Sequence, residues 1–397
     1  MKIIAVNAGS SSLKFQLLDM PSELVLISGI VERIGQEKSE IKIKLNGEKI
    51  VETLTIKDHS IAVELLLKKL IELKVVNKLD EIDGVGHRVV HGGEAFTDSV
   101  VITDEVIKAI ESVSDLAPLH NPANLTGIFA FQKALPHIMG VAVFDTAFHQ
   151  TMDEDAYLYG VPYEWYENYG VRKYGFHGTS HKFVSLRAAE LLGKKPEDVN
   201  IVVLHIGNGA SLCAVQGGKS VDTSMGFTPL AGILMGTRSG DIDPAIVEFI
   251  SKKENKTVKE VISELNKKSG YIGISKNSSD SRDLWTAAHG GDKQSLKAIT
   301  KQVKMICDYV AAYYVTMGSI DAICFTAGVG ENAIFTRQLI ANRLAPLGVK
   351  LDIERNYIRG TEALISADDS KIKLYLLPTD EEVMIARDTL RLSNIKG

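Results

Sequence analysis

The sequence is poor in cysteine and lacks any long run of one charge. Its three cysteines, Cys213, Cys307 and Cys324, lie far apart and form no C-x-x-C motif. Because all three have apolar neighbours, we expect buried free thiols and no disulfide framework. The net charge is −5 over 397 residues, and no long basic segment occurs. This balance argues against nucleic acids and anionic membranes as partners.

The sequence also lacks a long apolar segment and a low-complexity linker. No stretch is long enough to cross a bilayer. The apolar run at residues 3–6 gives way to the polar Asn7, so it is too short for a signal peptide. We therefore expect a cytoplasmic protein, and its length allows two domains of ordinary size.

What the sequence does contain is an alternation of apolar strands and amphipathic helices, which is typical of α/β proteins. Strands are expected over residues 2–6 and 13–18. A helix is expected after Ser60, another after a capping box that begins at Thr257, and a long one over residues 296–317. These elements predict an α/β fold.

Two segments far apart in the sequence have a similar pattern. Residues 3–10 and residues 202–209 each read as a buried strand followed by a turn of small residues, and a second strand comes after each turn. Two similar halves with a glycine-rich turn apiece suggest a duplicated fold with a nucleotide in its cleft. We place the boundary between the halves near residue 147.

Three turns are rich in the small residues that let backbone N–H groups approach a phosphate. They cover residues 7–12, with Lys14 just beyond, residues 205–211, and residues 328–332, which we expect to open a helix at about Ala333. Each alone could be an ordinary tight turn of an α/β protein. None is a P-loop or a G-x-G-x-x-G fingerprint, but three together favour nucleotide binding.

Two arginines and one aspartate are candidates for an anion site. Arg88 and Arg238 are flanked by glycines and small residues, and guanidinium groups match the oxygens of carboxylates and phosphates. Asp145 follows the apolar run 141–144, at the end of an expected strand, where ligands often bind in α/β sheets. The alternatives are structural salt bridges for the arginines and a turn cap for Asp145.

Histidine is frequent enough for a zinc site to be considered. The pairs His87–His91 and His177–His181 have i, i+4 spacing, but the first lies in an expected strand and Gly178 should break a helix in the second. No H-E-x-x-H motif occurs, which argues against catalytic zinc. A histidine that donates a hydrogen bond to a phosphoryl oxygen is the better interpretation, and His177 is the best placed.

Five segments resemble the signature sequences of acetate kinases. They are residues 7–14 (NAGSSSLK), 86–93 (GHRVVHGG), 144–149 (FDTAFH), 174–181 (YGFHGTSH) and 235–241 (MGTRSGD). The similarity runs in the family's order over nearly the whole chain, from residue 3 to about 388. On these motifs the chain is identified as a member of the acetate kinase family.

The resemblance implies a duplicated actin-like fold, also described as sugar-kinase-like or ribonuclease H-like, with a nucleotide cleft between two domains. The first domain would cover residues 1–147 and be completed by the C-terminal helix within residues 381–397. The second, nucleotide-binding domain would cover residues 148–380. The resemblance also implies a homodimer.

The resemblance further implies a role for each matching residue. Asn7 and Glu381 would position magnesium, with manganese as an alternative. Asp145, His177 and Arg238 would be catalytic. Arg88 would bind the acetate carboxylate, and the methyl group would lie in a pocket of Val90, Leu119, Phe176 and Pro229. ATP or ADP would be held by Lys14 and by three turns: His205, Ile206, Gly207, Asn208 and Gly209; Asp280, Ser281 and Arg282; and Gly328, Val329, Gly330, Glu331 and Asn332.

Two positions depart from the family pattern. Asp380 stands where the family has Asn, and Ser281 stands where some members have a larger apolar residue. The second departure bears on an expected contact with adenine.

The expected reaction is the reversible, magnesium-dependent transfer of the ATP γ-phosphoryl group to acetate. A carboxylic acid with a pKa of about 4.3 is already ionised at neutral pH, so no general base is required. We therefore infer that Asp145 chiefly orients Arg88 or the metal shell.

Three other functions compete with this interpretation. A propionate or butyrate kinase differs by methylene groups, each of which contributes only about 1–3 kcal/mol to discrimination. A sugar kinase of the same fold would need a base for a neutral hydroxyl, whereas Arg88 matches a carboxylate. A non-catalytic actin-like ATPase has no use for such an arginine.

Overall fold

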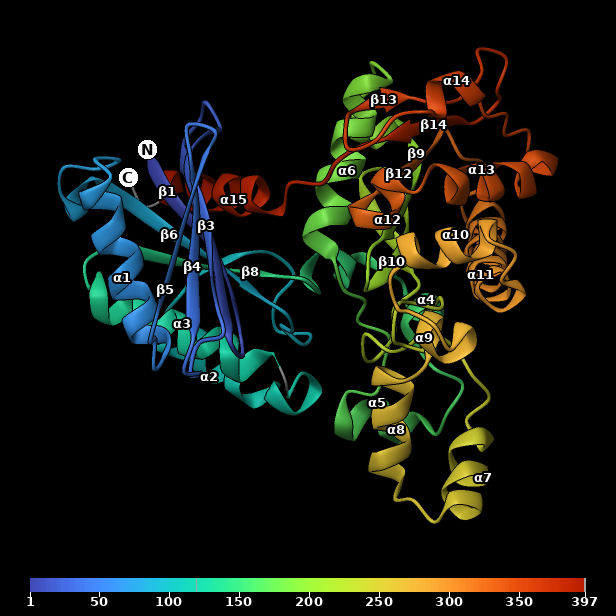
Figure 1. Ribbon diagram of the computed structural model, residues 1–397, viewed down its shortest axis with the longest axis horizontal. Coiled ribbons are helices and arrows are strands. Elements are labelled where there is room, and N and C mark those ends of the chain that lie inside the picture. Colours follow the sequence, from blue (N-terminus) through green and yellow to red (C-terminus); the bar gives the residue numbers. More distant parts are fainter. Residues whose placement is uncertain (119, 396–397) are drawn as a thin grey trace. The chain divides into compact units, whose positions relative to one another are not determined.

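The computed structural model describes residues 1–118 and 120–395. Leu119, which we expected in the methyl pocket, lies outside the described residues. The chain divides into two compact units, the first made of Met1–Gln150 with the segment from Asp380 onward, and the second of Thr151–Thr379 (Figure 1). Each unit is built around its own β-sheet.

The first unit contains an eight-stranded sheet in the order β5-β4-β3-β2-β1-β6-β8-β7. Its strands are β1 (Lys2–Gly9), β2 (Ser12–Asp19), β3 (Leu24–Glu32), β4 (Ser39–Leu45), β5 (Glu48–Leu54), β6 (Ile82–Val89), β7 (Val100–Val101) and β8 (Met139–Phe144). Its helices are α1 (His59–Glu72), α2 (Asp104–Ser112), α3 (Asn121–Ala134) and α15 (Glu381–Ile395). Strands β1, β6 and β8 run parallel, and the other neighbours pair antiparallel.

The second unit contains a six-stranded sheet in the order β11-β10-β9-β12-β14-β13. Its strands are β9 (Asn200–Ile206), β10 (Ala210–Gln216), β11 (Lys219–Thr223), β12 (Ala322–Thr326), β13 (Ala363–Leu364) and β14 (Lys373–Leu376). Its helices are α4 (Glu154–Tyr157), α5 (Tyr163–Tyr169), α6 (Gly178–Leu191), α7 (Ala245–Glu254), α8 (Val258–Lys267), α9 (Gly270–Ser275), α10 (Ser281–His289), α11 (Lys293–Met317), α12 (Ala327–Asn332), α13 (Ile334–Arg343) and α14 (Ile353–Asn356).

The two sheets share one strand pattern. In each, the first strand (β1 or β9) pairs antiparallel with the next strand along the chain and parallel with a later one. A further parallel strand (β8 or β14) and a short antiparallel edge strand (β7 or β13) complete the pattern. The first sheet adds β4 and β5. The expected duplicated α/β fold is therefore confirmed.

Several local expectations are also met. Thr257 and Glu260 form both halves of the capping box that begins α8, and the long helix expected at 296–317 is α11. The helix expected after Ser60 starts slightly earlier, because Asp58 accepts a hydrogen bond from the backbone N–H of Ile61. The three cysteines are buried free thiols. No helix in the described part of the chain is long and apolar enough to span a membrane.

The C-terminal helix α15 returns to the first sheet, where it packs against β1, β6 and β8 (Figure 1). Side chains alternate between the two faces of a strand, and on β6 the residues that meet α15 are glycines. A Cβ atom on Gly86 would overlap Ile385 and lie 2.5 Å from Oγ1 of Thr389. The absence of side chains here lets the helix lie close to the sheet.

We expect Gly86→Ala to lower the unfolding temperature, because overpacking a core contact typically costs about 1–3 kcal/mol. Gly160→Ala is the matched control, since nothing lies within 4 Å of its added methyl group. Scanning calorimetry of both variants measures the difference. Equal unfolding temperatures for the two variants would contradict the close docking of α15.

Candidate functional site

A buried charged contact in the first unit joins Arg88, near the end of β6, to Asp145, just after β8. The guanidinium donates from Nε to Oδ1 of Asp145 at 2.9 Å and from Nη2 to Oδ2 at 2.6 Å. Asp145 is 1 % exposed and Arg88 is 20 % exposed. A buried ion pair with two hydrogen bonds fixes both side chains, because breaking it leaves an uncompensated charge.

Strand alternation explains why these residues meet. Val6 and Ala8 of β1 belong to the core beneath α1 and α3, so Asn7 between them points to the opposite face, which α15 covers. On β6, Gly86 faces α15, and Arg88 lies two residues further on the same face. Asp145 is anchored at the end of β6 by its backbone N–H, which donates to the carbonyl of Val89 at 3.0 Å.

The first turn of α15 brings two more carboxylates to this face. Burial raises the pKa of Glu381, and the charge of Arg88 partly offsets this effect. Its Oε1 atom is buried and has no hydrogen-bond partner within the described chain. The unpartnered oxygen of Glu381 and the amide of Asn7, which points to the same face of the sheet, are the kinds of oxygen ligand that a hard divalent cation prefers. The pair of residues expected to hold magnesium therefore fits such an ion.

The carboxylates around Arg88 favour its ionised form. Burial alone would lower the pKa of Arg88, but the carboxylates of Asp145, Glu381 and Glu382 outweigh it, so its pKa is raised. Lys14 pairs with Glu382 across the same face. Asp380 caps α15, since its Oδ1 accepts from the N–H of Val383 at 3.0 Å.

In the second unit, a cluster of histidines and serines surrounds the start of α6. His177 has a positive φ of 57° and precedes the first residue of the helix. Gly178 therefore starts a helix, and the expectation that it would break one was wrong. The ring of His177 stacks on His205 at a centroid distance of 4.1 Å and an angle of 22°.

Two serine hydroxyls tie this cluster together. Oγ of Ser211 lies 2.9 Å from Nδ1 of His177 and 2.7 Å from Nε2 of His181. Oγ of Ser180 lies 2.8 Å from Nδ1 of His205. His181 and both serines are fully buried, so the rings are held in fixed orientations.

Arg238 and His177 converge on Gly209, in the turn between β9 and β10. A Cβ atom on Gly209 would lie 3.5 Å from Nη1 of Arg238 and 3.9 Å from Nε2 of His177. Arg238 donates to the carbonyl of Pro229 at 3.2 Å, and no carboxylate of the described residues forms an ion pair with it. Burial lowers its pKa. A desolvated cation without a carboxylate partner beside an imidazole is suited to an anion.

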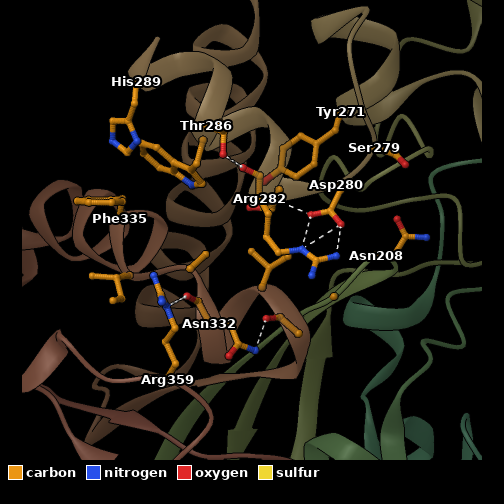
Figure 2. A pocket seen from close by; sticks show the side chains of 17 residues that line it. Asn208, Tyr271, Ser279, Asp280, Arg282, Thr286, His289, Asn332, Phe335 and Arg359 are labelled. Atoms are coloured by element: carbon orange, nitrogen blue, oxygen red, sulfur yellow. Dashed lines mark hydrogen bonds and ion pairs between the residues drawn. The ribbon is translucent and has the colours of Figure 1, made fainter.

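A large cavity of about 960 Å³ lies next to this turn, within the second unit (Figure 2). Eight residues predicted to hold the nucleotide line it: Gly207, Asn208, Asp280, Ser281, Arg282, Gly328, Val329 and Asn332. Asp280 caps α10, and its carboxylate accepts two hydrogen bonds from Nε of Arg282, at 3.0 and 3.2 Å, and one from Nη2 at 2.5 Å. The cavity has the size of a small-molecule site.

The remaining nucleotide candidates do not line this cavity. They are Lys14, which belongs to the first unit, and His205, Ile206, Gly209, Gly330 and Glu331. The segment 328–332, expected as a loop, forms the short helix α12 instead. The carbonyls at the end of this helix have a partner in the buried Arg337, whose Nη1 donates to those of Gly330 and Glu331 at 2.9 Å each.

The cavity also has residues that the sequence did not single out: Tyr271, Ser279, Trp285, Thr286, His289, Ala333, Ile334, Phe335 and Arg359. Trp285, His289 and Phe335 form an aromatic group, with ring centroids 4.8–5.4 Å apart. Figure 2 shows His289 and Phe335 at one end of the cavity and Asn208 and Ser279 at the other. The i, i+4 spacing of Trp285 and His289 after the cap Asp280 was the signal available in the sequence.

The expected methyl-pocket residues are divided between the units. Val90 lies in the first unit and is 5 % exposed, and its N–H donates to Oδ1 of Asn124 at 3.0 Å. Phe176, which is buried, and Pro229 lie in the second unit.

Comparison with known proteins decides the family. The model of the acetokinase family matches residues 2–387. The chain belongs to this family. An acetate kinase of Bacillus anthracis is 59% identical over 394 residues, which is 99% of each chain.

Solved structures agree with this assignment. The acetate kinase of Porphyromonas gingivalis is 46% identical, with a TM-score of 0.95 over 99% of both chains. A propionate kinase from Francisella tularensis is 41% identical, with a TM-score of 0.93 over 98% of this chain and 99% of that one. The two mixed α/β units thus have the actin-like fold expected for an acetokinase.

Proposed function

We propose that this acetokinase transfers the γ-phosphoryl group of ATP to acetate, giving acetyl phosphate and ADP, and that it also runs the reverse reaction. In a direct in-line step, a carboxylate oxygen forms a bond to the γ-phosphorus while the bond to the bridging oxygen breaks, and ADP keeps that electron pair. The observation that carries the proposal is the full-length similarity to acetate kinases at 59% identity. The geometry of the charged groups supports it.

Arg88 is proposed to bind the acetate carboxylate. Asp145 already occupies Nε and one proton of Nη2, so the outer edge, with Nη1 and the second Nη2 proton, is left for a substrate. That edge presents two parallel N–H groups, which match the two oxygens of a carboxylate. Because acetate arrives ionised, Asp145 has no proton to remove, and its role is to hold this edge in place.

Magnesium, or manganese in its place, is proposed to bind Glu381 and Asn7. When bound, the ion would offset negative charge on the phosphate oxygens. Glu381 fits because its buried Oε1 has no partner in the described chain. Burial raises the pKa of this carboxyl, and the charge of Arg88 lowers it. A bound cation would lower that pKa further and so favour the ionised form of the carboxyl.

The cavity of the second unit is proposed to hold ATP or ADP. Its aromatic end suits a flat nucleobase, since ring stacking is favourable for any base. Gly207 and Asn208 at the other end would face the phosphates. The helix end held by Arg337 and the predicted residues outside the cavity (Lys14, His205, Ile206, Gly209, Gly330 and Glu331) would support or extend this site.

His177 and Arg238 are proposed to stabilise the transferring phosphoryl group. Nε2 of His177 and Nη1 of Arg238 both lie within 4 Å of the Cβ position of Gly209. Donors that are already in place can offset the charge that spreads over the equatorial oxygens without reorganising.

Propionate is the second candidate substrate, and the similarity to a propionate kinase of known structure favours it over other acids. Val90, Phe176 and Pro229, proposed to contact the methyl group, would favour acetate because their side chains are apolar. One extra methylene group alters discrimination by only about 1–3 kcal/mol, so propionate should be a poorer substrate that is still used.

A homodimer and a two-domain organisation belong to the same proposal. Tyr163, Trp165 and Tyr169 on α5 and Phe249 on α7 are 48–70 % exposed, and exposed aromatic side chains of this kind often mark protein interfaces. A second copy of the chain is the proposed occupant. The domains are proposed as residues 1–147 with 381–397, and 148–380.

An acyl phosphate assay tests the reaction. With ATP, magnesium and acetate, we expect a product that hydroxylamine traps as a hydroxamate, and a lower kcat/KM by about tenfold with propionate. EDTA should abolish the signal, and added magnesium should restore it. A higher kcat/KM with propionate, or no hydroxamate from either acid, would contradict the proposal.

The tryptophans offer a direct test of the nucleotide cavity. The chain has two tryptophans, and only Trp285 lines the cavity. We expect ADP to change the emission of the wild type, because the base would lie against the aromatic group. The change should vanish in Trp285→Phe and persist in the matched variant Trp165→Phe. The opposite pattern would place the base elsewhere.

A further inference from the structure

Ser211 lies at the centre of the histidine cluster, and its chemistry restricts the protons on both neighbouring rings. A hydroxyl group has one proton to donate and two lone pairs. Its Oγ is within hydrogen-bond distance of Nδ1 of His177 and Nε2 of His181. The hydroxyl can donate to only one of these nitrogens, so the other nitrogen must carry a proton and donate to Ser211.

Two arrangements of neutral rings satisfy this condition. In the first, Nε2–H of His181 donates to Ser211, the hydroxyl donates to Nδ1 of His177, and the proton of His177 lies on Nε2. In the second, all directions are reversed, and Nε2 of His177 carries a lone pair. The choice therefore decides what His177 presents on its outer side.

The surroundings of Nε2 distinguish the two arrangements. This nitrogen faces the Gly209 turn, where Nη1 of Arg238 also arrives. Ring stacking against His205 at 4.1 Å keeps His177 from tilting away. The charged and titratable groups around His177 include His181 on α6, His205 on β9 and Arg238. An anion at this place needs a donor, and a lone pair would repel it.

We propose that Ser211 is a positioning residue that holds His177 as the neutral tautomer with its proton on Nε2, ready to donate to a phosphoryl oxygen. His181 has the supporting role of supplying a proton to Ser211. This inference rests on the proposed phosphoryl transfer for its purpose, but the proton positions themselves can be measured without any reaction. It implies that His177 does not need to be an imidazolium to act as a donor.

The first experiment observes the tautomer directly. Long-range proton–nitrogen NMR spectra of histidine-labelled protein report which ring nitrogen is protonated, and His177→Gln assigns the signals. We expect a protonated Nε2 and an acceptor Nδ1 for His177 in the wild type at pH 8. A protonated Nδ1 with a bare Nε2 would overturn the proposal, whatever the enzyme's activity.

The second experiment measures kcat of Ser211→Ala between pH 6 and 8.5. Without the hydroxyl, the neutral ring loses its fixed tautomer and orientation, whereas a doubly protonated ring still offers Nε2–H. Since imidazole rings become more protonated as pH falls, we expect kcat to fall by about tenfold at pH 8.5 and by less at pH 6. The KM for acetate should stay within about threefold.

Ser211→Thr, which keeps the hydroxyl, should restore the profile of the wild type. Ser180→Ala is the matched control, because Ser180 bridges to His205 and not to His177. The dependence of kcat on pH in Ser180→Ala should have the same shape as in the wild type, even if kcat itself is lower. A Ser211→Ala profile with that same shape would overturn the proposal. Absence of hydroxamate formation in the wild type would instead count against the proposed function, and the NMR result would still decide the tautomer.

Discussion

The buried ion pair between Arg88 and Asp145 is the contact on which the first unit's charged site depends. Two hydrogen bonds join the groups at 2.9 and 2.6 Å in a place where Asp145 is almost inaccessible to water. Loss of one partner from such a pair typically costs about 3–5 kcal/mol, because the other charge is left buried. The parallel pairing of β6 and β8 brings the two residues together, and α15 closes the same face with Glu381. The face of the sheet that α15 covers therefore carries both the Arg88–Asp145 pair and the buried carboxylate of Glu381.

The second unit repeats the strand pattern but balances its charges differently. In the first unit, Arg88 and Lys14 each contact a carboxylate. Arg238 in the second unit donates to a backbone carbonyl and forms no ion pair among the described residues. No carboxylate of the described residues balances this charge, and a cavity of about 960 Å³ lies beside the turn that Arg238 approaches. The two units of the duplicated fold thus differ in their charges. The cations of the first unit named here form ion pairs, whereas Arg238 of the second unit forms none among the described residues.

Some of this could be predicted from the sequence, because it depends on local rules. Alternation along β6 places Arg88, and the end of an apolar strand places Asp145. The capping box at Thr257 predicted the start of α8. The helical form of residues 328–332 was not predicted, and one contact at its end comes from outside the segment, since Arg337 of the next helix donates to the carbonyls of Gly330 and Glu331. The contacts of Ser211 with His177 and His181 could not be predicted either. Ser211 lies on β10 and the histidines lie at the start of α6, and these segments meet only in the folded chain. The ring contact between Phe335 and Trp285 could not be predicted for the same reason.

We propose above all that Asp145 orients Arg88 and does not carry a proton. The most direct measurement is kcat/KM for acetate against pH, from about 6 to 9, in the wild type and in Asp145→Asn, with circular dichroism to confirm that the variant is folded. Acetate is already ionised throughout this range. The account predicts a severe loss at every pH, with profiles that stay parallel, because the variant lacks the charge that holds the guanidinium edge. A variant whose activity recovers steeply as pH rises, or with added small-molecule bases, would contradict it.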